Sequence, residues 1–287
     1  MYVYEAHNDY YGEFSDMSNK YIDNELLCNW LLSFYIDGYG ANTDDSLSHH
    51  ALSLYEEKIL ARELSFLEHM PGDVIEDDDT DYPESLKTFL GANRPKVLFY
   101  MGEKSIMARL SIMVCGAREA SEKGCEIAFE CGRQIAQAGY SVASGYARGV
   151  DRAAHKGALE AGGDTMAVLP YGLSRFRVHR SIAEVFDPGR FIAVSEVPPS
   201  FGFSVKSAYR RNKFLAAVAE AVIVVEPGES GGTWYSAERA YRMKKPLFYF
   251  EGERPGIRGR MNSLGGIRLE LNGGIPDLSP VYEQCFR

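Results

Sequence analysis

Seven short apolar runs, most of them separated by segments of helical length, constrain the fold of this chain more than any other sequence feature. The runs are hydrophobic throughout rather than at every second position, as in strands that are covered on both faces of a sheet. Crossover helices fit between most of them, for example at 120–138, 149–161 and 230–243. The pattern predicts an α/β fold with a doubly wound, mostly parallel sheet. The runs are 96–100, 111–116, 140–144, 165–170, 191–196, 221–226 and 246–250.

The first third of the chain differs from the rest in charge. Residues 1–95 carry 20 acidic and 5 basic side chains, a net charge of −15, whereas residues 96–287 carry 20 acidic and 26 basic ones, a net charge of +6. Apolar residues at helical spacing predict a small acidic helical domain over residues 1–75. A dense acidic run between prolines predicts a solvated linker and lead-in over residues 76–95. The core therefore spans 96–287, and a polyanionic partner is expected to bind there.

Several classes of protein are excluded by composition and motifs. No stretch reaches the roughly 18 uncharged apolar residues of a membrane span, and the amino terminus lacks the layout of a signal peptide. We therefore expect a cytoplasmic protein with no membrane partner. The five cysteines lack paired C-x-x-C spacing, and neither a metal-spaced histidine pair, a P-loop nor a dinucleotide fingerprint is present. No metal, cofactor or enzymatic activity is expected.

Candidate ligand-binding residues lie where the runs end, because doubly wound sheets bind ligands at the carboxyl ends of their strands. After the run 111–116, Gly116 permits close backbone approach and Arg118 can contact a phosphate through two N–H groups. Residues 144–155 pass two glycines and enter a helix, whose first amides attract an anion. Asp151 and His155 are either a helix cap and a structural hydrogen-bonding residue or direct ligand contacts. The candidates of this second segment are Ser144, Gly145, Arg148, Gly149, Asp151 and His155.

Two further segments add basic, amide and hydroxyl groups. Residues 209–214 are predicted at the start of the helix that leads to the fifth core strand, where a cluster of basic groups favours phosphate binding. Residues 226–233 again run from strand through glycines into a helix, as in a phosphate-binding nest. Together with the first two segments, they favour a polyphosphate or nucleotide ligand. The candidates are Arg210, Arg211, Asn212, Lys213, Ser230, Gly231, Gly232 and Thr233.

These segments, in this order, resemble the DprA/Smf (DNA-processing protein A) family, bacterial proteins that bind single-stranded DNA and pass it to the recombinase RecA during natural transformation. The sequence SGYARGVDRAAH at 144–155 is similar to the family signature S-G-x-A-x-G-[IV]-D-x-x-A-H, and residues 116–118 resemble its Gly-Ser-Arg. The likeness extends from about residue 81 to about residue 274. It implies a Rossmann-like core that binds single-stranded DNA, forms a homodimer and has a RecA-type recombinase as a partner.

The resemblance also implies roles for single residues. Arginines and a lysine would contact phosphates, and the glycines with Ser144, Ser230 and Thr233 would shape the pocket. The family's Arg-Asn-Arg is Arg-Asn-Lys at 211–213, and lysine keeps the charge but loses the planar two-pronged contact. We expect no carboxyl-terminal winged-helix domain of the kind that many members carry. The implied phosphate contacts are Arg118, Arg148, Arg211 and Lys213, and candidates to stack a base are Tyr146, Phe176, Tyr209 and Trp234.

Two other functions remain open. A sensor could bind a nucleotide or its derivative in the same groove and signal through the acidic domain. Salt would separate this sensor from a DNA-binding protein, because a strand held by several phosphates loses affinity steeply as salt rises. A phosphoribohydrolase of the "lonely guy" type resembles the segment 227–233, but its glutamate position is Ser236 here, and the nearest glutamate is Glu238. That displacement argues against carboxylate-assisted cleavage of an N-glycosidic bond.

Overall fold

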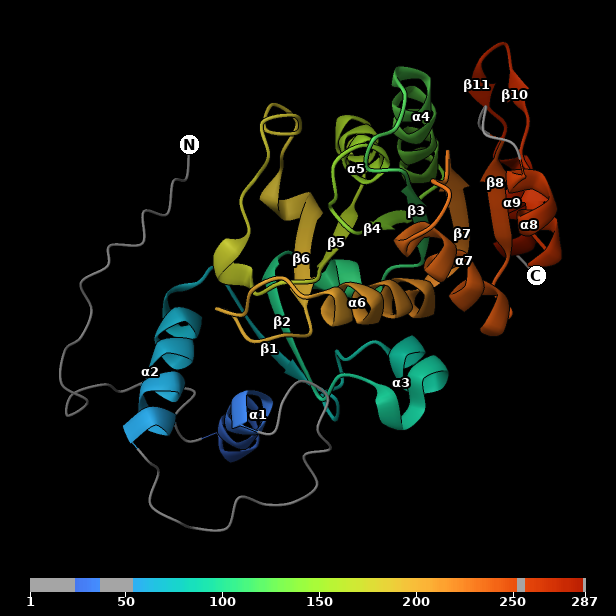
Figure 1. Ribbon diagram of the computed structural model, residues 1–287. Helices are drawn as coiled ribbons and strands as arrows, with labels where there is room; N and C mark the ends of the chain where they lie inside the picture. Colours follow the sequence, from blue (N-terminus) through green and yellow to red (C-terminus); the bar gives the residue numbers. More distant parts are fainter. Residues whose placement is uncertain (1–23, 37–53, 252–255, 286–287) are drawn as a thin grey trace. The chain divides into compact units, whose positions relative to one another are not determined.

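The computed structural model describes residues 24–36, 54–251 and 256–285, and the chain divides into two compact units, residues 1–68 and 69–287 (Figure 1). In the first unit the described residues form α1 (Glu25–Ile36) and most of α2 (Leu54–His69). The hydroxyl of Tyr35 donates to the Glu63 carboxylate at 2.8 Å and ties the two helices together. The described part of this unit is therefore helical. The rest of the predicted acidic domain within this unit lies outside the described residues.

The second unit is built around a sheet whose strands, within the described ranges, follow the order β1-β2-β6-β5-β4-β3-β7-β8-β9. The strands from β6 to β9 are parallel, whereas β2 pairs antiparallel with β6 and β1 with β2. The prediction of a doubly wound, mostly parallel sheet is confirmed. The strands are β1 (Gly72–Glu76), β2 (Val97–Gly102), β3 (Ser111–Gly116), β4 (Ser141–Ser144), β5 (Thr165–Leu169), β6 (Phe191–Ser195), β7 (Ala219–Val225), β8 (Leu247–Phe250) and β9 (Ile267–Arg268), with a separate hairpin of β10 (Leu271–Asn272) and β11 (Ile275–Pro276).

Helices cover both faces of this sheet. Successive side chains of a strand point to opposite faces, so Ile112 and Val114 of β3 pack with α4 and α5, whereas Met113 and Cys115 pack with α6 and α7. Burial on both sides explains why the strands are apolar throughout. Among the described helices, none is long and apolar enough to cross a membrane. The described helices of the second unit are α3 (Glu84–Leu90), α4 (Glu122–Gln137), α5 (Val150–Glu160), α6 (Val205–Val218), α7 (Gly232–Arg242), α8 (Ile257–Ser263) and α9 (Ser279–Cys285).

The strand order reverses between β3 and β7. From β3 the chain runs outward through β4 and β5 to β6, and α6 then returns it to β7 on the other side of β3 (Figure 1). The predicted crossover segments form α4, α5 and α7. Because the loops after β3 and β7 leave the sheet in opposite directions, they open a crevice at the carboxyl ends of these strands, where doubly wound sheets bind their ligands.

Residues 76–95 differ from the solvated linker that their charge predicts. β1 adds to the sheet beside β2, and α3 follows it, so the segment belongs to the second compact unit. Asp77 is only 8% exposed, and its carboxylate pairs with Arg94 at 2.6 Å and Lys96 at 3.2 Å. Basic side chains beyond the run neutralise part of its charge, which lets this acidic stretch pack against the sheet.

Candidate functional site

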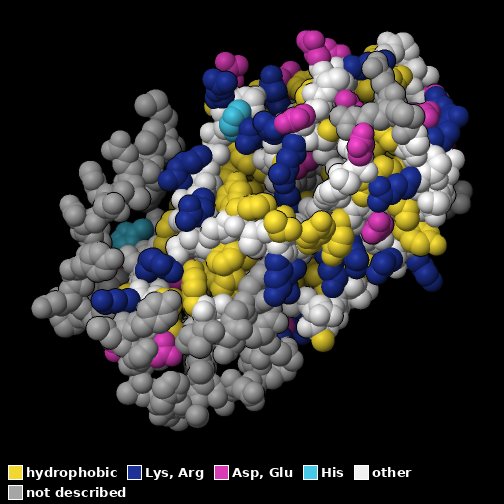
Figure 2. All heavy atoms as spheres, viewed as in Figure 1, with side chains coloured by type: hydrophobic (Ala, Val, Ile, Leu, Met, Phe, Trp, Pro, Cys, Tyr) yellow, Lys and Arg dark blue, Asp and Glu magenta, His cyan; other side chains and the backbone are white. Residues whose placement is uncertain are grey.

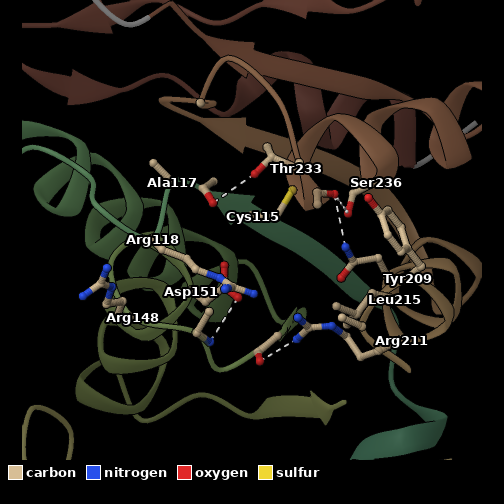
Figure 3. A pocket seen from close by; sticks show the side chains of 18 of the residues that line it. Cys115, Ala117, Arg118, Arg148, Asp151, Tyr209, Arg211, Leu215, Thr233 and Ser236 are labelled. Atoms are coloured by element: carbon tan, nitrogen blue, oxygen red, sulfur yellow. Dashed lines mark hydrogen bonds between the residues drawn. The ribbon is translucent and has the colours of Figure 1, made fainter. Parts of the chain in front are cut away.

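A pocket of about 630 Å³ lies at the reversal point, between the loops that follow β3, β4 and β7 and one side of α6 (Figure 3). Its volume is in the range of small-molecule and nucleotide sites. All four segments predicted from the sequence contribute to its lining. The predicted residues that line it are Gly116, Arg118, Gly145, Arg148, Asp151, Arg211, Asn212, Ser230, Gly231, Gly232 and Thr233.

Side-chain hydrogen bonds fix the loops around the pocket. The Thr233 hydroxyl donates to the Gly116 carbonyl at 3.0 Å, and the Asn212 amide donates to the Gly232 carbonyl at 3.1 Å. A Cβ atom at Gly116 would lie 2.0 Å from the Val225 carbonyl oxygen, so only glycine lets β3 pass this close to β7. Thr233 and Asn212 therefore hold α7 in place against β3 and α6.

Arg211 and Asp151 are buried side chains of opposite charge at the floor of the pocket, and each is influenced by the other's charge. Arg211 is 5% exposed, and its Nη1 donates to the carbonyls of Gly145 at 2.5 Å and Val168 at 3.0 Å. The Asp151 carboxylate accepts from the Ala147 amide at 3.2 Å. The pKa of Asp151 is raised, because the effect of burial exceeds the opposite effects of the Arg211 charge and the loop amides. Arg211 thus brings positive charge to the pocket floor, and Asp151 compensates part of it.

Two exposed arginines stand at the mouth of the pocket. Arg148 pairs with the Glu119 carboxylate, and both side chains are largely exposed, so the pair contributes at most about 1 kcal/mol. Arg118 is exposed as well, and no carboxylate of the described residues forms an ion pair with it, although Asp151 lies within reach of its charge. Arg118 is therefore available to an anionic ligand, and Arg148 becomes available once a phosphate replaces Glu119.

An internal carboxylate occupies the amino-terminal end of α4. The Glu226 side chain accepts from the Ser121 amide at 3.0 Å and from the Ser121 hydroxyl at 2.7 Å. Glu226 has a φ of 46°, a conformation that residues with a Cβ rarely adopt. A Cβ atom at Gly124 would lie 2.0 Å from its Oε2, so glycine is needed there to make room. In dinucleotide-binding sheets this end of the first crossover helix holds the pyrophosphate, and here it is already filled.

Residues 73–265 match the protein family described as DNA recombination-mediator protein A. The chain belongs to this family. The match covers more than half of the chain and contains every segment that lines the pocket, so the resemblance predicted from those segments is confirmed. The description names a mediator of DNA recombination.

Named family relatives share part of their length with this chain. Protein Smf of Escherichia coli is 29% identical over 210 residues, which are 71% of this chain and 55% of the relative. A putative DNA processing protein DprA of Mycobacterium tuberculosis is 30% identical over 205 residues, 66% of this chain and 51% of the relative. The chain thus spans about half the length of these relatives.

Two solved structures share the family fold. DNA processing protein A from Streptococcus pneumoniae superposes with a TM-score of 0.64 at 24% identity, over 88% of this chain and 95% of that one. DNA processing protein A from Helicobacter pylori, described by its single-stranded DNA binding mode, superposes with a TM-score of 0.58 at 22% identity, over 70% of this chain and 91% of that one. At these identities the likeness shows a common fold.

Three predicted residues of the second segment, Ser144, Gly149 and His155, do not line the pocket. Ser144 is fully buried and donates to the Val114 carbonyl at 2.6 Å, which joins β4 to β3. His155 is also fully buried, with Nδ1 2.6 Å from the Thr165 hydroxyl. Since Thr165 donates its own proton to a carbonyl, Nδ1 of His155 must donate to Thr165. Burial lowers the pKa of His155 to about 3, so the structure favours the structural interpretation of this neutral residue.

The start of α5 also differs from the sequence interpretation. The helix cap is Gly149, with a φ of 77°, and not Asp151, whose carboxylate lies in the first turn and accepts from the preceding loop. A Cβ atom at Gly149 would lie 2.4 Å from the Ala117 carbonyl oxygen. Gly149 therefore allows the loops after β3 and β4 to approach each other, although it does not line the pocket.

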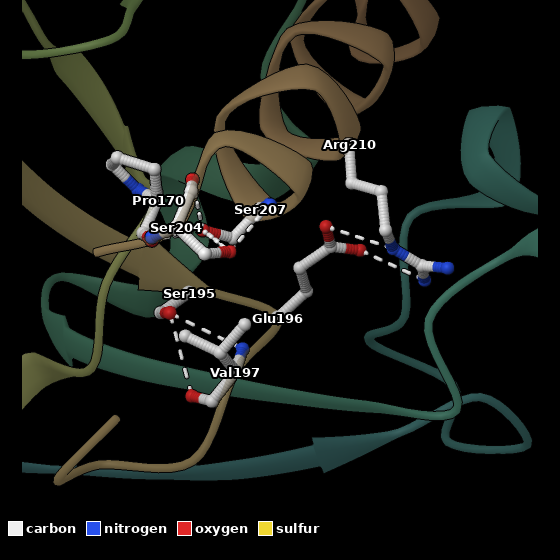
Figure 4. A network of polar contacts seen from close by, with 7 residues as sticks. All are labelled: Pro170, Ser195, Glu196, Val197, Ser204, Ser207 and Arg210. Carbon is white, nitrogen blue, oxygen red and sulfur yellow. Dashed lines mark hydrogen bonds and ion pairs between the residues drawn. The ribbon is translucent and has the colours of Figure 1, made fainter. Parts of the chain in front are cut away.

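The basic cluster 210–213 lies in the middle of α6 rather than at its start. The helix begins at Val205 and is capped by Ser204, whose hydroxyl accepts from the Ser207 amide at 3.0 Å (Figure 4). Consecutive helical residues are 100° apart, so Arg210 and Arg211 face different surroundings. Arg210 pairs with Glu196 at 3.2 Å, outside the pocket (Figure 4). Lys213 also lies outside the pocket lining.

The apolar residues at the lip of the pocket were not predicted from the sequence. Phe203 and Val205 line it and are 56% and 64% exposed. The spacing of Ser204 and Ser207 is a capping pattern that could have placed the start of α6 beside them. Among the stacking candidates, Tyr146 and Trp234 are buried and Phe176 packs on Tyr146, whereas Tyr209 lines the pocket with 41% exposure.

Proposed function

We propose that this chain binds single-stranded DNA in the pocket at the carboxyl ends of β3, β4 and β7. The observation that carries the proposal is Arg118, an exposed cation in the pocket that forms no ion pair with the described carboxylates. Arg211 adds positive charge from below, and the glycine-rich start of α7 offers backbone amides. Such contacts hold phosphates without reading the bases. The described DNA-binding mode of the Helicobacter pylori relative supports the same ligand.

The proposal extends to the cellular role of the chain. Membership in a family of recombination mediators supports a cytoplasmic function in DNA processing, in which the bound strand is passed to a recombinase of the RecA type. Weak phosphate contacts suit such a transfer, because the recombinase can replace them one by one. We further propose that the chain works as a homodimer, since two pockets on one strand increase affinity through effective concentration. Sedimentation of the full chain with and without a long oligonucleotide tests the dimer.

The geometry gives less support to the two alternative functions. A nucleotide sensor would use the end of α4 for a di- or triphosphate, and the Glu226 carboxylate already fills that position. A phosphoribohydrolase would need a free carboxylate on the first turns of α7. The structure has Ser236 in the pocket there, and Glu238 lies outside the lining, with a 3.6 Å contact to Arg260. Binding of a strand is the function that this arrangement serves best.

Reversal of the charge at Arg118 tests the proposed site. Fluorescence anisotropy of a labelled oligothymidine should show that Arg118→Glu weakens binding by about 30-fold or more, because an ionic hydrogen bond is replaced by repulsion. Binding to the unchanged protein should weaken steeply with salt, by roughly 0.7 log units per phosphate contact for each tenfold increase. Duplex of equal length and free nucleotides should compete poorly.

Arg180→Glu is the matched control, because Arg180 is exposed and lies outside the pocket lining. The affinity of this variant for the oligothymidine should stay within about threefold of that of the unchanged protein, because the altered charge acts on the strand only through a long-range, screened interaction. A folded Arg118→Glu variant that binds the oligonucleotide normally would overturn the site. Competition by free nucleotides at the same concentration as the strand would favour the sensor instead.

A further inference from the structure

Aromatic and basic side chains continue from the lip of the pocket onto the neighbouring surface of α6 and α7. Tyr209 lines the pocket (Figure 3). Its ring centroid lies 4.7 Å from that of Tyr235 on α7, with the two planes at 72°. The guanidinium of Arg239 lies 4.5 Å from the Tyr235 ring centre. This surface of the second unit carries apolar groups flanked by Lys and Arg side chains (Figure 2). The three side chains thus form one continuous row that starts inside the pocket.

Helical spacing adds a fourth member to the row. Tyr209 and Lys213 are four residues apart on α6, and Tyr235 and Arg239 are four apart on α7, so each pair shares one helix face. We call these four residues the α6–α7 track. Each helix contributes one aromatic ring and one basic group to it.

The basic groups of the track form no ion pair with a carboxylate in the described part of the chain, although the charge of Glu196 raises the pKa of Lys213 against the other influences. No carboxylate there forms an ion pair with Lys213 or Arg239, and Nε of Arg239 is buried without a hydrogen-bond acceptor. Burial lowers the pKa of Lys213, and the nearby Arg210 and Arg239 lower it further. Like charges held this close favour an anion that binds between them. The row starts in the pocket, so the ligand expected along the row belongs to the same class as the ligand expected in the pocket.

We infer that a single strand held in the pocket continues along the α6–α7 track, where a base stacks on Tyr209 and the next phosphate contacts Lys213 and Arg239. Tyr235 positions the Tyr209 ring from the side opposite the base, and Arg239 is oriented by its contact with Tyr235. A duplex cannot use the track, because its bases are already stacked within the helix. The inference rests on the proposed function and adds the direction in which the strand leaves the pocket.

Binding as a function of oligonucleotide length tests the track in the full chain. An oligothymidine of about 4 nucleotides fills the pocket, and one of about 15 nucleotides also reaches the track. Tyr235→Leu and Arg239→Gln should weaken binding of the long strand by about 5- to 20-fold and leave the short strand unchanged. Arg239→Gln should also reduce the salt dependence for the long strand by roughly one phosphate contact.

Two variants outside the track serve as controls. Tyr241→Leu changes an exposed tyrosine on α7 that is six residues from Tyr235 and therefore faces another direction. Arg180→Gln removes an exposed charge that lies outside the pocket lining. Both should bind strands of either length as the unchanged protein does.

Photocrosslinking places the strand independently of affinity. Single 5-iodouracil bases along the long oligonucleotide should crosslink to Tyr209 from one position only, identified by mass spectrometry, and the crosslink should weaken in Tyr235→Leu. Normal affinity of both track variants for the long strand, or crosslinks confined to other surfaces, would overturn the track while the pocket stands. Absence of oligonucleotide binding by the unchanged protein would overturn the proposed function and the track together.

Discussion

The helices α4 and α7 both begin where a strand of the sheet ends, yet their first turns meet different surroundings. The start of α4 is filled from within, by the Ser121 cap and the Glu226 carboxylate. The start of α7 has no side-chain cap, and its first residues, Gly231 to Thr233, line the pocket. Because backbone amides at a helix start attract anions in either case, the internal carboxylate decides which end remains open to a ligand. The same strand-to-helix arrangement can therefore serve opposite purposes.

An acidic side chain at α7 would remove the difference between the two ends. Ser230→Asp places a carboxylate at the open helix start, where it imitates Glu226 and repels phosphates. We expect a loss of strand affinity of about 100-fold, measured by anisotropy with a labelled oligothymidine. The fold should be kept, because an acidic residue is favourable at the start of a helix. Ser230→Asn, which has the same shape without the charge, is the control, and an equal loss in both variants would contradict the electrostatic explanation.

A larger residue at Gly124 would disturb the filled end from the opposite side. Gly124→Ala places a methyl group 2.0 Å from Oε2 of Glu226, so the carboxylate must move away from Ser121. The free energy of unfolding in urea should fall by about 2 kcal/mol, as in other overpacked sites. In the background of Glu226→Ala the same substitution should cost much less. Equal costs in both backgrounds would show that Glu226 does not determine the need for glycine.

The middle of α5 offers a third case, in which the buried, neutral His155 joins the helix to Thr165 of β5. His155 has its pKa lowered to about 3, so protonation favours the unfolded chain, where the pKa is about 6.5. The stability that depends on neutral His155 is fully present above pH 6.5 and is lost as the pH falls toward 3. The slope should reach at most about 1.4 kcal/mol per pH unit. Urea titrations of the unchanged chain and His155→Gln measure it, and identical pH profiles would assign the acid sensitivity to other groups.

Loss of the Glu226 charge should have the smallest effect of these changes, and the effect should be on ligand affinity. Glu226→Gln keeps an acceptor for the Ser121 amide but removes the negative charge from the end of α4. We expect a gain of about fivefold in the affinity for free nucleoside diphosphate, with little change for the strand. Isothermal titration with the diphosphate measures the gain. A variant that binds diphosphate no better than the unchanged chain would mean that other groups also close this end.

Most of the sheet could be predicted because its strands are buried on both faces and are therefore apolar throughout. The pocket segments could be predicted because ligands of such sheets bind at strand ends. The direction of single side chains could not be predicted, since neighbours in sequence such as Arg210 and Arg211 point to different surroundings. For the same reason, the sequence could not show that the side chains of Ser144 and His155 are buried.

Contacts between distant parts of the chain account for the remaining differences. The Glu226 carboxylate meets Ser121 across 105 residues, and no local pattern at either position indicates the contact. Asp77 is neutralised by Arg94 and Lys96, which lie beyond the end of its acidic run. In both places, partners supplied by the tertiary fold changed the meaning of a local charge pattern.

The antiparallel pairing of β1 with β2 limits how the pocket can be isolated for experiments. β1 pairs with β2 over five residues, from Gly72 opposite Met101 to Glu76 opposite Val97. A fragment that begins at the acidic run would leave this edge of β2 bare, and unpaired strand edges recruit other chains. Truncations that aim to separate the pocket from the helical amino-terminal unit should therefore start before Gly72, or their aggregation will be mistaken for loss of function.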